Sequence, residues 1–118
     1  MRVFVRIFAA VALPCLALHL ACRGTPGAGD TRAEGKELFD SGCGKCHGSD
    51  GRGGVPAAEG LAAPRNFVDA SFQASRTDAQ LREAVTSGKG QMPPFGRVYD
   101  ERQLGLLVAH IRSFNPKK

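Results

Sequence analysis

The feature that most constrains this chain of 118 residues is the motif CGKCH at residues 43–47, in which a histidine directly follows the second of two cysteines. Residues i and i+3 of a helical turn share one face, so Cys43 and Cys46 would present their thiols side by side. His47 would then place an imidazole next to them. Three kinds of site fit such a motif: a redox-active cysteine pair, half of a zinc site, and a covalent haem attachment site.

The rest of the sequence favours the haem site among these three. A redox-active CxxC pair normally follows a strand in a βαβ unit, and no segment here alternates like a strand. A structural zinc ion takes four ligands, but residues 22–118 contain no second CxxC and no paired histidines. The motif therefore predicts a c-type haem, with Cys43 and Cys46 bonded to its two vinyl groups and His47 bound to iron.

Residues 1–21 are expected to be an export signal rather than part of the folded domain. Two arginines precede a run that is apolar apart from His19 and too short to span a bilayer comfortably. The run ends in LALHLAC, which resembles a bacterial lipoprotein signal and implies a lipid on Cys22. An ordinary signal peptide that ends near a cysteine is the alternative. Residues 22–30, rich in glycine, are expected to be a flexible tether, so the protein would be exported to the periplasm and anchored to a membrane.

The charge distribution argues against a nucleic-acid partner. Over the whole chain, 16 lysines and arginines exceed 11 aspartates and glutamates by five, and two of those arginines lie in the expected signal, which leaves +3. The charges alternate along the sequence and form no basic stripe, which nucleic-acid binding would require. The length allows one small domain.

Three segments have the start signal of a helix, in which a capping residue is followed three positions later by Glu or Gln. The pairs are Thr31 with Glu34, Thr77 with Gln80, and Asp100 with Gln103. They predict helices over residues 32–42, 78–87 and 101–114. In the last of these, apolar residues recur at helical spacing and predict a buried stripe: Leu104, Leu107, Val108 and Ile111. The predicted fold class is all-α.

With helices around a CxxCH motif, residues 31–118 resemble a class I c-type cytochrome, the monohaem periplasmic kind. The resemblance implies a small cytochrome c fold, in which three main helices and their loops wrap around one covalently bound haem c. The first and last helices of that family cross at a glycine and an aromatic residue, which Gly35 and Phe39 match. On the last helix a leucine precedes an aromatic residue by three positions. Leu107 fits, but His110 replaces the aromatic and is expected to be a partly exposed helix residue.

The resemblance also implies the remaining site residues. The family has a methionine as second axial ligand, and Met92 in GKGQMPPFG is the only methionine beyond the expected signal. Two prolines after Met92 predict a stiff extended strap. In the family a proline carbonyl accepts the hydrogen of the axial histidine, a role that Pro64 could fill, although an ordinary loop proline is an equal alternative. Six side chains are expected around the haem: Phe39, Phe67, Leu81, Val85, Phe95 and Leu107.

The function implied by the resemblance is one-electron transfer in a periplasmic or membrane-associated electron transport chain. Two axial side chains leave no open position for a substrate, so no catalytic residue is expected. The alternatives are a haem subunit of a larger periplasmic oxidoreductase, and a haem enzyme or gas sensor in which Met92 leaves the iron. The expected partners are redox proteins that dock transiently near Lys45 and Lys89, and a membrane reached through Cys22; the chain is expected to be a monomer.

Overall fold

The computed structural model describes residues 28–54, 56 and 58–116. The expected export signal and Cys22 lie outside these residues. The described part contains five helices: α1 (Ala28–Gly42), α2 (Gly44–His47), α3 (Ala70–Ser75), α4 (Asp78–Ser87) and α5 (Glu101–Ser113). Among these residues there is no strand, only an isolated bridge between Lys89 and Met92. The predicted all-α class is therefore confirmed.

Two of the three predicted helix starts are confirmed. Thr77 and Asp100 each accept a hydrogen bond from the backbone three residues on, and the Gln at that position bonds back, which completes both capping boxes. The third prediction was wrong, because α1 begins at Ala28 and Thr31 lies inside it. Its partner Glu34 binds Arg102 of α5 instead, with two contacts of 2.6 Å. Glu34 thus joins α1 to α5 by an ion pair.

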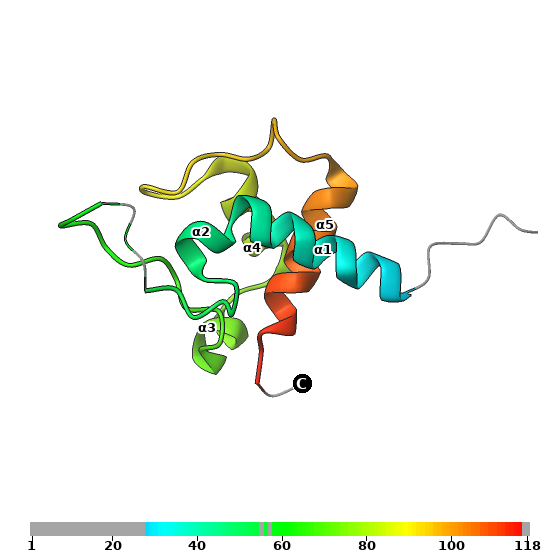
Figure 1. Cartoon of the computed structure of the whole chain (residues 1–118), viewed down its shortest axis with the longest axis horizontal. Helices are drawn as coiled ribbons and strands as arrows, with labels where there is room; N and C mark the ends of the chain where they lie inside the picture. Colours follow the sequence, from blue (N-terminus) through cyan, green and yellow to red (C-terminus); the bar gives the residue numbers. More distant parts are fainter. Residues whose placement is uncertain (1–27, 55, 57, 117–118) are drawn as a thin grey trace, which may run out of the picture.

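The crossing of α1 and α5 forms the centre of the core (Figure 1). Phe39 and Leu107 are completely buried there, and Leu104 is nearly so. Gly35 allows the close approach, since a Cβ at this position would lie 2.8 Å from the Leu106 carbonyl oxygen. Gly35 and Phe39, which the family resemblance placed at this crossing, therefore do pack there.

His110 lies in the same crossing and packs as an aromatic side chain would. Its ring centroid is 5.0 Å from that of Phe39 and 4.9 Å from that of Phe114. Its Nε2 atom is buried without a hydrogen-bond partner among the described residues. Burial lowers the pKa of His110; the nearby Asp40 carboxylate opposes this effect and the Lys36 ammonium adds to it. The expectation of a partly exposed residue is met, but its ring belongs to the helix interface.

We expect His110→Phe to reduce the loss of stability on acidification. The folded-state pKa of His110 lies below that of the unfolded chain, about 6.5. As the pH falls through that value the unfolded chain binds the proton first, so stability is lost until the folded-state pKa is passed. Thermal unfolding of the haem-loaded protein at pH 7 and pH 5 measures the effect. Wild type should lose more than the variant; an equal loss in both would contradict the argument.

Candidate haem site

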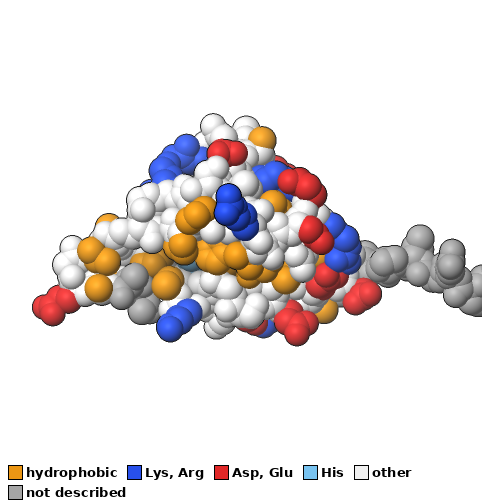
Figure 2. Space-filling model, turned by 90° about the horizontal axis from the view of Figure 1, so that it is seen from above, with side chains coloured by type: hydrophobic (Ala, Val, Ile, Leu, Met, Phe, Trp, Pro, Cys, Tyr) orange, Lys and Arg blue, Asp and Glu red, His pale blue; other side chains and the backbone are white. Residues whose placement is uncertain are grey.

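A cavity of about 1380 Å³ lies beside the α1–α5 core. Much of its wall is apolar, and hydrophobic side chains gather in a band across the face shown in Figure 2. Five of the six side chains expected around the haem line it: Phe39, Phe67, Leu81, Val85 and Phe95. The expectation for Leu107 was wrong, because this side chain, fully buried in the helix crossing, is not among those that line the cavity. Ile111, one helical turn further along α5, lines the cavity in its place.

The attachment motif forms a short helical turn at the cavity wall. The backbone N–H groups of Cys46 and His47 both donate to the Cys43 carbonyl, at 3.1 and 2.9 Å. Both cysteines line the cavity and neither forms a disulfide. Gly42, just before the motif, leaves room for the Tyr99 hydroxyl, which would lie 2.1 Å from a Cβ at that position.

The thiol chemistry of this pair differs from that of a redox-active one. Cys43 is only 8% exposed, and burial raises the pKa of its thiol to about 11, with a smaller contribution from Cys46. Redox-active CxxC pairs depend instead on a thiol whose pKa is lowered, because the thiolate is the nucleophile. The structure therefore favours a pair that is consumed in attachment over one that exchanges disulfides.

His47 is held by one hydrogen bond and one ring contact. Its Nδ1 atom lies 3.1 Å from the Arg65 carbonyl oxygen. A carbonyl only accepts, so Nδ1 carries the hydrogen and Nε2 retains the lone pair that a metal ion would take. The imidazole also stacks on Phe67, with centroids 4.6 Å apart and planes at 19°. Burial lowers the pKa of His47, and the Arg65 carbonyl partly offsets this.

The acceptor at His47 is not the residue named from the sequence. The carbonyls of Pro64 and Arg65 both lie close to Gly53, where a Cβ would be 2.5 and 3.1 Å from their oxygen atoms. Gly53 adopts φ +69° and donates its N–H to the His47 carbonyl at 2.7 Å. Of these two carbonyls, the one that meets His47 is that of Arg65. Pro64 itself lines the cavity.

Met92 reaches the same cavity from the segment that follows α4. The residues just before Met92, for which the sequence analysis made no prediction, form a turn. Lys89 and Met92 exchange two backbone hydrogen bonds of 3.1 Å, which close a tight turn, and Gly90 within it has φ +61°. A Cβ at Gly88 would lie 2.5 Å from the Met92 carbonyl oxygen, so the turn packs directly against the end of α4.

The strap after Met92 is fastened to α4 by its backbone. Phe95 donates its N–H to the Val85 carbonyl and Gly96 donates to the Thr86 carbonyl, both at 3.0 Å. These bonds use carbonyls near the end of α4 that the helix itself leaves free. Met92 is half-buried in consequence, and its thioether has a fixed backbone on both sides.

These residues together fit a covalently attached haem. A single cavity large enough for a macrocycle is lined by two thiols, one imidazole and one thioether. The Nδ1 atom of the imidazole is hydrogen-bonded to the Arg65 carbonyl. Within residues 28–54, 56 and 58–116, no group of three or more His, Cys, Asp or Glu side chains could hold a metal ion. The second thiol pair or histidines that zinc would require are thus not assembled in this part of the chain.

Comparison with known proteins agrees with this geometry. Residues 30–111 match the family model described as cytochrome c oxidase, cbb3-type, subunit III. The chain belongs to this family of c-type cytochromes. Membership implies a covalently bound haem c and makes the chain an electron-transfer haem protein.

Individual relatives support the same conclusion. The chain is 30% identical over 88 residues to the cbb3-type cytochrome c oxidase subunit CcoP of Azospirillum sp. (strain B510), covering 73% of this chain and 29% of that protein. It is 37% identical over 89 residues to CcoP of Helicobacter pylori (strain 52), covering 70% and 28%. This c-type cytochrome thus spans less than a third of the curated relatives it matches.

A solved structure confirms the predicted fold. The KustC0563 c-type cytochrome superposes with a TM-score of 0.60 at 32% identity, covering 69% of this chain and 96% of that one. The predicted small cytochrome c fold, all-α around a haem site, is therefore confirmed.

Sequence reasoning missed the wall of the cavity that α3 builds. Asp69 caps this helix, since its carboxylate accepts from the N–H groups of Ser71 at 2.8 Å and Phe72 at 3.4 Å. A capping Asp was the available signal, but the helix is only six residues long and has no Glu or Gln at the third position. Phe72 and Arg76, which α3 positions, both line the cavity.

Proposed function

We propose that this c-type cytochrome carries single electrons through one haem c, with His47 and Met92 as the axial ligands of its iron. The observation that carries the proposal is that both side chains line one cavity with Cys43 and Cys46. Bound haem supplies an iron that alternates between the ferrous and ferric states. Cys43 and Cys46, the only cysteines among the described residues, would hold the haem covalently.

The chain's own residues suit this role in three ways. The Arg65 carbonyl orients His47 and increases its electron donation to a metal ion. Met92 supplies a soft thioether, which favours ferrous iron and raises the reduction potential. Apolar side chains such as Phe67 and Leu81 line the cavity and suit the apolar faces of a macrocycle. With both axial positions filled there is no open position for a substrate.

Redox titration and carbon monoxide binding test this proposal. We expect the haem-loaded protein to titrate as a single one-electron centre, because the chain has one attachment motif and two axial side chains. We expect the ferrous form to bind carbon monoxide slowly, because Met92 must first leave the iron. Rapid binding would instead support the enzyme or gas-sensor alternative.

A second candidate function is that of a haem subunit in a larger oxidoreductase. It is favoured by the relatives, which are subunits of cytochrome c oxidase and more than three times as long as the part that this chain matches. Purification with another chain at fixed stoichiometry would favour this candidate. A monomer that exchanges electrons with a soluble partner, at a rate that falls with added salt, would favour the free carrier. Lys45 and Lys89, both exposed, are the proposed docking charges.

We further propose that the protein is exported to the periplasm and attached to a membrane by a lipid on Cys22. Within the described residues no helix has the length and apolar character needed to cross a membrane. The structure moves one expected boundary, since α1 begins at Ala28, inside the segment 22–30 assigned to the tether. Release of Cys22→Ser from the membrane fraction, with wild type retained there, tests the anchor.

A further inference from the structure

A buried polar cluster lies behind the cavity wall and is centred on Gln73 of α3. Among the described residues, Gln73 is the only polar or charged one in the buried class, with 4% exposed. Its Nε2 group donates to the carbonyl of Phe67 at 2.8 Å and to the carbonyl of Ile111 in α5 at 2.9 Å. Both amide hydrogens are therefore used, and they join the cavity wall to the last helix.

Arg112 of α5 completes the cluster from the other side. Its Nη1 donates to the side-chain and backbone oxygens of Gln73, both at 2.8 Å, and its Nη2 donates to the Arg76 carbonyl. Its Nε bonds the Asp78 carboxylate at 2.7 Å. The guanidinium thus satisfies carbonyls at the free end of α3, which that short helix cannot pair itself. Its side chain is 17% exposed.

The chemistry of the cluster allows one orientation of the Gln73 amide. The two carbonyls can only accept a hydrogen bond and the Arg112 guanidinium can only donate one, so the amide nitrogen must face the carbonyls and the amide oxygen must face Arg112. No other uncharged side chain of this length supplies both donors and an acceptor here. A satisfied buried network of this kind fixes the positions of its members.

The cluster reaches His47 through the segment at residues 65–67. Gln73 holds the Phe67 carbonyl, while the Phe67 N–H donates to the Gly51 carbonyl at 2.7 Å. The Phe67 ring stacks on the His47 imidazole. Two residues earlier, the Arg65 carbonyl accepts the hydrogen of His47 Nδ1. The acceptor and the stacking ring of His47 therefore belong to one short segment that Gln73 ties to α5.

We propose that Gln73 and Arg112 act as a clamp that tunes the reduction potential by fixing the Arg65 carbonyl against His47. The proposal rests on the ligation of haem by His47 proposed above. A hydrogen bond from the outer nitrogen raises the basicity of a ligating histidine, and a more basic ligand stabilises the ferric state. Loosening the clamp weakens that bond and so raises the potential. Gln73 and Arg112 are both positioning residues, since neither side chain lines the cavity.

Gln73→Met tests the clamp because methionine has a similar length, no charge and no donor hydrogens. We expect the reduction potential of the haem-loaded protein to shift upward. In the ferrous protein, the His47 Nδ1 hydrogen should exchange with deuterium about five- to tenfold faster, the factor that corresponds to one hydrogen bond of ordinary strength. A purely structural role would lower the unfolding temperature and leave both of these quantities unchanged.

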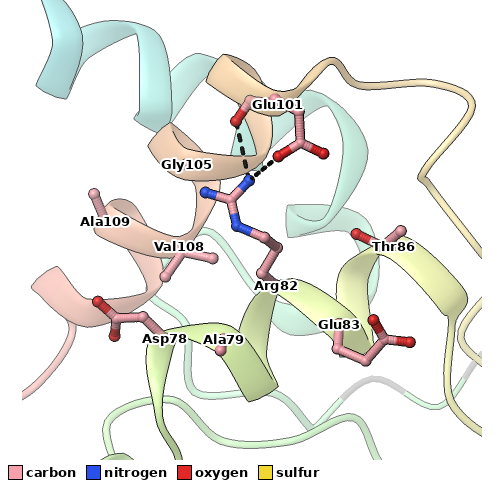
Figure 3. Close-up of a pocket in the computed structure, with 9 residues that line it drawn as sticks. All are labelled: Asp78, Ala79, Arg82, Glu83, Thr86, Glu101, Gly105, Val108 and Ala109. Atoms are coloured by element: carbon pink, nitrogen blue, oxygen red, sulfur yellow. Dashed lines mark hydrogen bonds and ion pairs between the residues drawn. The ribbon is translucent and has the colours of Figure 1, made fainter.

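A matched pair of lysine substitutions provides the control. Arg112→Lys keeps the charge, but a lysine cannot reach Gln73, Asp78 and Arg76 together. The potential and the exchange rate should therefore both rise, as in Gln73→Met. Arg82→Lys makes the same change in the groove between α4 and α5, where Arg82 binds the carbonyl and carboxylate of Glu101 at 3.1 and 2.9 Å (Figure 3). The groove shares Asp78 with the clamp, but none of residues 65–67 lines it and Arg82 binds Glu101 there, so this variant should keep wild-type values.

The outcomes separate the clamp from the function on which it rests. The clamp is overturned if Gln73→Met keeps the wild-type potential and exchange rate. It is also overturned if Arg112→Lys has the same potential and exchange rate as Arg82→Lys. This second comparison decides the question if Gln73→Met does not fold. The proton NMR spectrum of the wild-type protein is examined first. If the His47 ring protons lack the chemical shifts that a bound haem imposes, the proposed ligation and the clamp are both overturned.

Discussion

Replacing both Cys43 and Cys46 with alanine is expected to give a chain that carries no haem after denaturing electrophoresis and does not fold stably. Removal of both thiols leaves no residue in the described part that could form a thioether bond. The cavity of about 1380 Å³ would then lose the covalent hold on the group that fits it. A domain of this size buries little apolar surface by itself, so an unfilled cavity of that volume should prevent cooperative folding.

The control for this experiment is Cys22→Ser, which also removes a thiol but lies outside the attachment motif. It should keep haem staining in the gel and a cooperative thermal transition. Circular dichroism and haem staining measure folding and attachment separately. The interpretation fails if wild type is folded without haem, or if the double variant retains haem in the denaturing gel.

The parts of this structure that sequence predicted are those set by local chemistry. The spacing of Cys43, Cys46 and His47 predicts that these side chains lie together, because a single helical turn determines their positions, and all three line the cavity. Thr77 and Asp100 located two helix starts for the same reason, since each cap involves residues only three apart. Met92 was named because the resemblance implies a methionine ligand and it is the only methionine beyond the expected signal; its side chain does line the cavity, and its ligation of iron stays a prediction.

The parts that sequence did not predict depend on contacts between distant segments. Glu34 looked like half of a cap, but its carboxylate binds Arg102 across the core. Pro64 and Arg65 both have carbonyls close to Gly53, and only the folded path of residues 47–53 and 64–67 places that of Arg65 at His47. Gln73 would be assigned to a surface by composition alone, since most glutamines are exposed. Only its carbonyl partners in two other segments explain its burial.

Met92→Ala is expected to keep the haem attached but to lower its reduction potential by on the order of 0.1 V, a fraction of the roughly 0.8 V range that axial ligands span. Attachment should persist because Cys43, Cys46 and His47 are unchanged. The potential should fall because the thioether that favours ferrous iron has gone. The weak long-wavelength band of the ferric protein, which arises from sulfur-to-iron charge transfer, should disappear, and carbon monoxide should bind the ferrous form rapidly.

Two further variants decide whether these changes come from the thioether itself. Gln91→Ala alters the adjacent residue of the same turn, which also lines the cavity, and should keep the band, the potential and slow carbon monoxide binding. Met92→His should keep both axial positions filled, and so exclude carbon monoxide, while still lowering the potential. If Met92→Ala instead behaved like Gln91→Ala, Met92 would be a packing residue. His110 or a ligand from outside the chain would then have to be considered, and the assignment as an electron carrier rather than an enzyme or sensor would lose its main support.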